Sequence, residues 1–315
     1  MKKFFSLNIL LLVFNVANAQ FDSQYGLNMF NHMEINPGYA GSKDAVSLVL
    51  LGREQWMGFD GAPTTQVFSI HTPFKLFKAK HGAGLSITND KIGFETNMGI
   101  HLSYAYHKYM GQGNLGIGFN VGMINQSLSP EWKYPEQGSD PAVPVGGDDK
   151  PMIFDMGLGV FYETDNFHLG ISTTHINQPK IKYKDGVVDD KYSYISRHYY
   201  ISAGYNYQLA NPLFEFRPSI FIESDQTSSQ YSINGTMLYN KRFWGGVSYR
   251  LTDAVIAMLG VEFISGLKVG VAYEMPATTK INYQYQSGSF EFAISYTFNV
   301  SVEKEKNVYK SIRFL

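Results

Sequence analysis

Residues 113–128 read GNLGIGFNVGMINQSL, and this stretch decides the fold. Every second residue from Leu115 to Met123 is apolar, and only glycine or asparagine stands between them. A period of two places the apolar side chains on one face of a β-strand and the small or polar ones on the other. The stretch therefore predicts a strand with one apolar face and one face of small, polar residues.

The same alternation recurs between Asp44 and Asn299 in about fourteen segments, each followed by a turn. A tilted strand needs about 9–11 residues to cross a bilayer, which is the length of most of these segments. The segments lie at 44–52, 64–73, 81–90, 97–110, 113–128, 152–163, 166–176, 197–209, 213–225, 228–240, 242–252, 254–265, 266–276 and 289–300.

The composition of the polar face distinguishes a membrane barrel from a soluble sandwich. This face carries mainly Gly, Ser, Asn and Ala rather than the Lys, Glu and Thr that open solvent favours. The apolar face often ends in Tyr or Phe, as the aromatic girdle of a membrane interface requires. We therefore expect an all-β, single-domain protein: a transmembrane antiparallel β-barrel of about 14 strands around a crowded, wet lumen.

The connections alternate in length. Those after the first, fifth, seventh and thirteenth segments are long (53–63, 129–151, 177–196 and 277–288), and most of the others are short. Outer-membrane barrels combine short periplasmic turns with long outer loops, so both termini are expected to be periplasmic. Two connections fit less well, because the second (74–80) is rather long and the eleventh is very short.

Residues 1–19 have the features of a signal peptide. A basic start at Lys2 and Lys3 precedes an apolar run, and Ala17-Asn18-Ala19 is an A-x-A cleavage site. The apolar run is shorter than the ~20 residues of a membrane helix. We therefore expect the chain to be exported and cleaved, so that the mature protein begins at Gln20. Its expected location is the outer membrane of a Gram-negative bacterium.

The other segments follow from these boundaries. Residues 20–43 form an N-terminal arm that lies either along the periplasmic rim or in the lumen. The barrel occupies 44–300, and 301–315 form a periplasmic tail.

No residue pattern predicts a catalytic, cofactor or metal site. The chain has no cysteine, and its net charge of -1 gives no nucleic-acid footprint. His101 and His107 would lie about 20 Å apart along a strand, too far for one metal ion. His168 and His175 differ by an odd number and should face opposite ways. The acidic pairs of the loops at 148–149 and 189–190 lack the spacing of a calcium site.

Charged residues on the expected lumen face are concentrated in the second half of the chain. They are Glu215, Arg217, Glu223, Arg250, Glu262, Lys268, Glu274 and Glu291. Such a set either stiffens the interior of the barrel or lines a polar path for a solute or an inserted peptide.

Two blocks of the sequence resemble a known family. INPGYAGS at 35–42 and GREQWMGFDGAPTTQVFSIHTP at 52–73 resemble the PorP/SprF family, Bacteroidetes outer-membrane proteins of type IX secretion and gliding motility. The matching residues are Asn36, Pro37, Tyr39, Ala40 and Gly41, then Arg53, Gln55, Trp56, Gly58, Gly61, Ala62, Pro63 and Thr65.

The resemblance implies a role without catalysis. Members of this family are barrels paired with secreted adhesins or other cargo that carry a C-terminal type IX sorting domain. On this basis the protein anchors or helps to export such a cargo by binding that domain, with outer-membrane lipid around it. The alternatives are a porin or transporter for a small solute, and a structural component that contacts periplasmic, peptidoglycan-linked subunits.

The second block is expected to form the first outer loop. Gly58, Gly61 and Pro63 favour a tight, fixed loop, while Trp56 and Phe59 offer rigid aromatic area to a partner. A plug inside the lumen and a loop that contacts a partner are both open. The expected partner-binding or plug residues are Arg53, Gln55, Trp56, Gly58, Phe59, Gly61, Ala62, Pro63, Thr65, Asn36, Pro37 and Tyr39.

Overall fold

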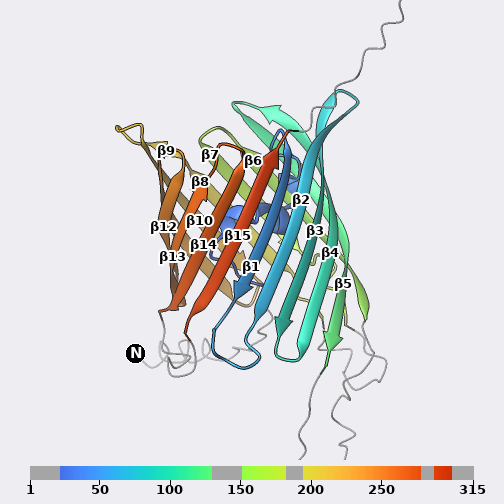
Figure 1. Ribbon diagram of the computed structural model, residues 1–315. Coiled ribbons are helices and arrows are strands. Elements are labelled where there is room, and N and C mark those ends of the chain that lie inside the picture. The colour runs from blue at the N-terminus through green and yellow to red at the C-terminus, as the bar shows by residue number, and fades with distance from the viewer. Residues whose placement is uncertain (1–21, 130–150, 182–193, 278–286, 300–315) are drawn as a thin grey trace, which may run out of the picture.

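A computed structural model describes residues 22–129, 151–181, 194–277 and 287–299, and its strands form an open-ended barrel (Figure 1). Three short helices precede the strands: η1 (Asn28–Phe30), α2 (His32–Ile35) and η2 (Pro37–Tyr39). The strands are β1 (Val46–Glu54), β2 (Thr64–Leu76), β3 (Ala79–Ile92), β4 (Glu95–Met110), β5 (Gly113–Leu128), β6 (Met152–Glu163), β7 (Phe167–Thr174), β8 (His198–Tyr205), β9 (Tyr207–Gln208), β10 (Phe214–Ser224), β11 (Ser229–Tyr239), β12 (Phe243–Arg250), β13 (Ala254–Glu262), β14 (Leu267–Pro276) and β15 (Ser289–Phe298).

The sheet closes on itself. Each strand pairs antiparallel with its neighbours in the sequence, β1 pairs with β15, and β10 pairs with β11. The two-residue β9 continues β8 along β10, so the structure is a closed 14-strand antiparallel barrel. The predicted fold class is confirmed. Because the register pairs Val46 with Phe298, β1 begins at the end of the barrel where β15 ends.

The two faces of the strands divide as the alternation predicts. In β5, Ile117 is 52% exposed and Phe119 45% exposed on the outer surface, whereas Asn114 and Asn120 are buried inside. An outer surface of exposed aliphatic and aromatic side chains is suited to contact with the lipid tails of a membrane. Within the described ranges, no helix is both long and apolar enough to cross a bilayer.

The two ends of the barrel differ in their connections. At one end, called the short-turn end, strands are joined by tight turns. The prediction of a connection over 74–80 at this end was wrong. There β2 and β3 extend to a two-residue turn, Phe77-Lys78, whose φ values of 49° and 66° match a type I′ hairpin. The opposite end, the long-loop end, carries the connection at 55–63 and the other long connections, which lie mostly outside the described residues.

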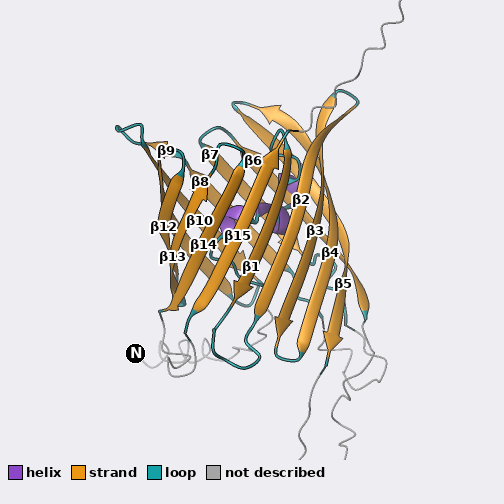
Figure 2. Ribbon diagram, viewed as in Figure 1, coloured by secondary structure: helices purple, strands orange, loops and turns teal. Residues whose placement is uncertain are grey.

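Residues 22–43, called the arm from here on, run through the inside of the barrel, where Figure 2 shows their helices in purple. The arm starts near the long-loop end, where Asp22 contacts His198 at the start of β8. It finishes at the short-turn end, where Lys43 pairs with Glu163 at the end of β6. The first described residue thus lies at the opposite end from Asn299, while residues 1–21 and 301–315 lie outside the described residues.

Part of the lumen is dry rather than wet. Leu27 of the arm is fully buried, with Tyr25 beside it, against inward-facing apolar residues of the wall. The wall residues of this cluster are Leu51, Val67, Leu238, Trp244, Ile256, Met258, Ala272 and Ala293. At these positions, β1, β2 and β11–β15 are therefore apolar on both faces, because the arm covers the inner one.

Candidate functional site

A buried ionic network holds the first half of the arm. The carboxylate of Glu291 on β15 accepts hydrogen bonds from the backbone N–H groups of Gly26 (2.6 Å) and Leu27 (2.7 Å). The same carboxylate pairs with Arg53, which reaches inward from the end of β1 and is 4% exposed. Arg53 also donates from Nη2 to Glu274 Oε2 at 2.9 Å. Glu291 therefore joins the arm to β1 and β15 at once.

The network continues along the wall and balances its charges. Arg250 Nη1 lies 3.1 Å from Glu274 Oε2 and 3.0 Å from Asp253 Oδ2. Burial of an unpaired charge costs several kcal/mol, so the alternation of cation and anion is what lets these groups stay dry. Four of the predicted lumen charges, Arg250, Glu274, Glu291 and Glu223, are indeed buried inside the barrel.

Asn36 and Pro37 fix the middle of the arm. The Asn36 side chain accepts a hydrogen bond from the Gly38 N–H (2.9 Å), which caps η2, and Pro37 takes the first helical position. The same side chain donates to the carbonyl of Val160 on β6 at 3.0 Å. Asn36 therefore sets the local turn and attaches it to the wall.

The wall glycines provide the space for this backbone. A Cβ on Gly118 would overlap the carbonyl oxygen of Pro37, and one on Gly116 would overlap that of Gly38. Gly159 faces the Asn36 side chain and Gly82 faces the Ala40 carbonyl in the same way. These four residues, the seat glycines, explain much of the small inner face of β3, β5 and β6: it is small because the arm lies directly on it.

Tyr39 and the residues after it pack against histidines of the wall. The Tyr39 ring lies 5.0 Å from that of Phe161 and 5.2 Å from that of His71, both edge-on. His107 Nε2 donates to the Ala40 carbonyl at 2.6 Å, and the Gly41 N–H donates to His71 Nδ1 at 3.1 Å. Asn36, Pro37 and Tyr39, predicted as plug or partner residues, all lie inside the lumen.

The start of the arm is held by an ion pair. Asp22 Oδ1 lies 3.1 Å from His175 Nε2, and Asp22 Oδ2 accepts a hydrogen bond from the Tyr200 hydroxyl at 2.7 Å. The carboxylates of Asp22 and Asp155 thus face the two ring nitrogens of His175 from opposite sides. No sequence pattern pointed to this group, because its members are far apart in the chain.

The loop at 55–63 stands at the rim instead of folding into the lumen. The Gln55 N–H bonds to the Pro63 carbonyl (2.9 Å), and Met57 exchanges two backbone hydrogen bonds of 2.8 Å with Ser287 and Gly288. Trp56, Gly58 and Gly61 adopt positive φ, which shapes the tight turns. Phe59, at the tip, is 52% exposed.

The remaining predicted residues of this block divide between the rim and the interior. Ala62 donates its N–H to the Phe59 carbonyl within the loop. Thr65, at the start of β2, is buried and donates to Asp90. Arg53 and Thr65 thus lie in the interior, next to the arm. The residues at the rim are Gln55, Trp56, Gly58, Phe59 and Gly61.

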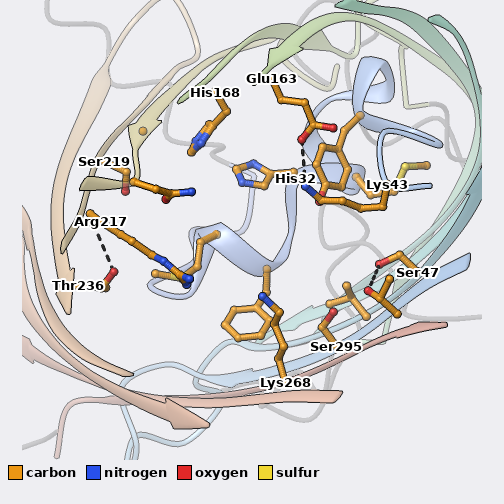
Figure 3. A pocket seen from close by; sticks show the side chains of 18 of the residues that line it. His32, Lys43, Ser47, Glu163, His168, Arg217, Ser219, Thr236, Lys268 and Ser295 are labelled. Atoms are coloured by element: carbon orange, nitrogen blue, oxygen red, sulfur yellow. Dashed lines mark hydrogen bonds and ion pairs between the residues drawn. The ribbon is translucent and has the colours of Figure 1, made fainter. Parts of the chain in front are cut away.

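A cavity of about 310 Å³ lies between the arm and the wall in the short-turn half (Figure 3). Its lining includes three of the other predicted lumen charges, Arg217, Glu262 and Lys268, and each cation has a partner. Lys43 lies 3.0 Å from Glu163, and Glu262 pairs with both Arg217 (2.8 Å) and Lys268 (2.9 Å). The cavity is therefore polar, but its charges largely neutralise one another.

One solved structure supports the same architecture, and two others resemble the chain more weakly. The Ralstonia pickettii toluene transporter TbuX is similar at TM-score 0.51 and 11% identity, over 86% of this chain and 94% of that one. The CymD monoaromatic hydrocarbon channel gives TM-score 0.49 and 12% identity, over 86% and 93% of the two chains. A Rh. blastica porin mutant gives TM-score 0.32 and 11% identity, over 80% and 100%. At these identities only the fold is comparable.

Sequence comparison identifies the family. No curated protein sequence matches this chain significantly. A family model described as "Type IX secretion system membrane protein PorP/SprF" matches residues 17–296, which include the arm, the rim loop and every barrel strand up to β15. The chain therefore belongs to the PorP/SprF family of type IX secretion system membrane proteins, and it forms an outer-membrane β-barrel.

Proposed function

We propose that this protein is a non-enzymatic anchor at the outer membrane that binds the C-terminal sorting domain of a secreted, adhesin-like cargo. The family assignment supports a place in type IX secretion. The proposal rests mainly on two structural features of the barrel. The arm occupies the lumen, and an ordered loop with an exposed aromatic side chain lies at the rim.

The rim loop has the properties of a binding surface. Its backbone is fixed by hydrogen bonds to Pro63, Ser287 and Gly288, so a partner need not order it, which saves conformational entropy on binding. Phe59 presents an exposed aromatic ring at its tip, and rigid aromatic side chains are frequent anchors of interfaces.

The proposal includes an orientation. In outer-membrane barrels the longer connections face the cell exterior and the short turns face the periplasm. On this basis the long-loop end, with Phe59 and the start of the arm, faces outward, where an exported cargo arrives. The short-turn end, with the cavity beside Lys43 and Arg217, then faces the periplasm.

A pair of matched variants tests the binding surface. Phe59→Ala removes the ring at the rim, and Phe77→Ala removes an equally simple ring that is 92% exposed at the opposite end. In a binding assay between the purified barrel and the sorting domain of its cognate adhesin, Phe59→Ala should weaken binding by about tenfold or more. Phe77→Ala should bind as the wild type does. Equal binding by the two variants would remove the rim loop from the proposal.

A porin or transporter is the second candidate, and the polar cavity around Lys43, Arg217 and Lys268 is the observation that favours it. The position of the arm argues against transport, because the arm lies in the lumen along the length of the barrel. Planar-bilayer recording of the purified barrel separates the two. A stable channel of porin size supports transport, whereas silence supports an anchor.

A structural role in the secretion machinery, through contact with periplasmic peptidoglycan-linked subunits, makes a different prediction. Loss of such a component should stop the secretion of every type IX cargo, whereas loss of an anchor should affect only its own cargo. Secretome comparison of a deletion strain with its parent distinguishes these outcomes.

A further inference from the structure

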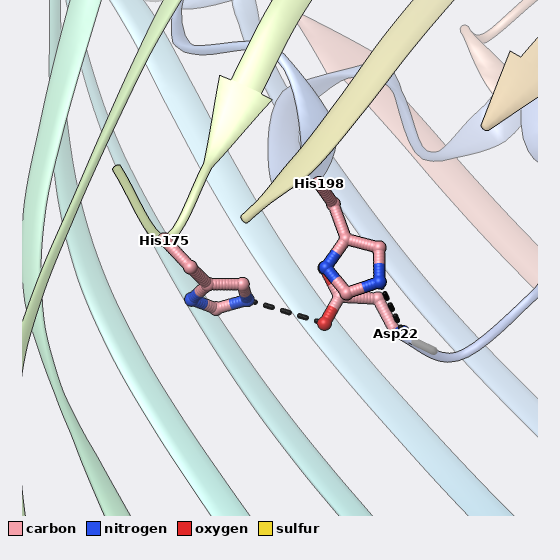
Figure 4. A group of neighbouring side chains, drawn as sticks. All are labelled: Asp22, His175 and His198. Carbon is pink, nitrogen blue, oxygen red and sulfur yellow. Dashed lines mark hydrogen bonds and ion pairs between the residues drawn. The ribbon is translucent and has the colours of Figure 1, made fainter. Parts of the chain in front are cut away.

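Three potential metal ligands meet where the arm enters the lumen. Figure 4 shows His175 and His198 turned toward Asp22, and the ligand atoms of the three residues all lie within 4.8 Å of one another. Asp22 comes from the arm, His175 follows β7 and His198 begins β8. Both histidines are buried, with exposures of 8% and 1%.

The spacing of these atoms suits zinc. Asp22 Oδ1 lies 3.1 Å from His175 Nε2, and Asp22 Oδ2 lies 3.6 Å from His198 Nδ1. Zinc bonds of about 2.0–2.2 Å in a tetrahedron place neighbouring ligand atoms about 3.3 Å apart. The two distances above go to different oxygens of Asp22, so a site with one Asp22 oxygen requires a small movement of the side chains. It also requires His198 Nδ1 to release the Ser196 carbonyl, which lies 3.1 Å away. Two imidazoles with one carboxylate favour zinc over calcium or magnesium, which prefer oxygen ligands alone.

A carboxylate stands behind one of the histidines. His175 Nδ1, the nitrogen that points away from Asp22, lies 2.9 Å from Asp155 Oδ1. Asp155 is 2% exposed, and His101 Nε2 lies 2.9 Å from its other oxygen. A carboxylate that orients a metal-binding histidine through its second nitrogen is a usual feature of zinc sites.

The surroundings favour a cation. A cavity of about 160 Å³ adjoins the cluster, and its lining includes the carboxylates of Asp22, Glu34, Asp90 and Asp155. Among the described residues that line it there is neither lysine nor arginine. The side-chain oxygen of Asn120, 4% exposed, also lines it and has no hydrogen-bond partner among the described residues. The cavity thus collects oxygen acceptors and leaves room for waters around a bound ion.

We propose that Asp22, His175 and His198 form a zinc site that fastens the start of the arm to β7 and β8, with Asp155 as a positioning residue for His175. The ion would link the arm to β7 and β8 of the barrel wall at the long-loop end through metal–ligand bonds. The fourth ligand is water from the adjoining cavity. The site is independent of cargo binding at the rim loop.

Zinc titration of the intact mature barrel in detergent tests the site. The protein is stripped with a chelator and titrated with ZnCl₂ in a calorimeter, and its folded state is checked by circular dichroism. The variants are His175→Gln and His198→Gln, which keep hydrogen-bonding capacity but remove the imidazole. His81→Gln is the matched control, since His81 is also buried but bonds to Tyr104 in the short-turn half.

We expect one zinc ion per wild-type and His81→Gln barrel, and binding at least about tenfold weaker in the two ligand variants. Absence of stoichiometric zinc in the wild type, or equal affinity in all variants, would overturn the proposal. Equal affinity would place the metal elsewhere. If a ligand variant does not fold, Co²⁺ added to the wild type decides: intense visible absorption of a tetrahedral site supports the proposal, and its absence refutes it.

Discussion

Replacement of Glu291 by glutamine should loosen the arm. The Glu291 carboxylate accepts two hydrogen bonds from the arm, at 2.6 and 2.7 Å, and neutralises Arg53. Glutamine keeps the shape of the side chain but carries no charge. Both oxygens of the Glu291 carboxylate accept hydrogen bonds here, so the amide nitrogen of a glutamine would have to face a hydrogen-bond donor.

The magnitude follows from the burial of the network. Hydrogen bonds to a charged group contribute about 1.5–3 kcal/mol each, and removal of one partner of a buried ion pair costs about 3–5 kcal/mol. These contributions overlap, because Arg53 keeps Glu274 as a partner. We therefore expect Glu291→Gln to lower the free energy of unfolding by about 3 kcal/mol.

Glu54→Gln is the matched control. Glu54 neighbours Arg53 and stands opposite Phe290 in the register, but it is exposed. A surface change of this kind should alter stability by less than about 0.5 kcal/mol. The assay is reversible urea unfolding of both variants in the same lipid or detergent. Unfolding of Glu291→Gln at the wild-type midpoint would refute the account of how the arm is held.

Three further predictions concern the arm and its seat. Gly118→Ala should destabilise the barrel by about 1–3 kcal/mol in the same unfolding assay, because the new Cβ meets the backbone of Pro37; Gly52→Ala, whose Cβ would meet nothing within 4 Å, should not, and equal effects would contradict the close contact. Asn36→Ala should cost about 1–2 kcal/mol through loss of the η2 cap and the bond to the wall, with wild-type stability as the refuting outcome. Deletion of residues 22–43 should convert a silent barrel into a conducting one in planar bilayers; a silent deletion variant would mean that something other than the arm closes the lumen.

The strands could be predicted because their alternation is local. A period of two is visible in single segments such as 113–128, and the structure has a strand with those bounds. The facing ends of β2 and β3 were misjudged: the sequence placed a connection at 74–80, whereas β2 runs to Leu76 and β3 begins at Ala79. In the structure Pro73 stays in the strand, opposite Gly82.

The site could be predicted only in part, because it depends on contacts across the barrel. The sequence identified the charges of β10–β15 as inward-facing, and it left the arm with Asn36 and Pro37 either in the lumen or along the periplasmic rim. It did not show which of these residues meet. Glu291 finds its partners at positions 26, 27 and 53, and Asp22 finds its partners at 175 and 198. The seat glycines likewise looked like lumen residues facing water until the path of the arm gave them a function.

The central claim, that the barrel anchors a secreted cargo, is tested most directly in cells. The gene is deleted, and the cognate adhesin is measured in washed cells and in the medium by quantitative immunoblot. Complementation uses the wild type, Phe59→Ala or Phe77→Ala. The account predicts that the adhesin moves to the medium in the deletion strain and with Phe59→Ala, and returns to the cells with the wild type and Phe77→Ala. An adhesin that stays on the cells of the deletion strain would contradict it.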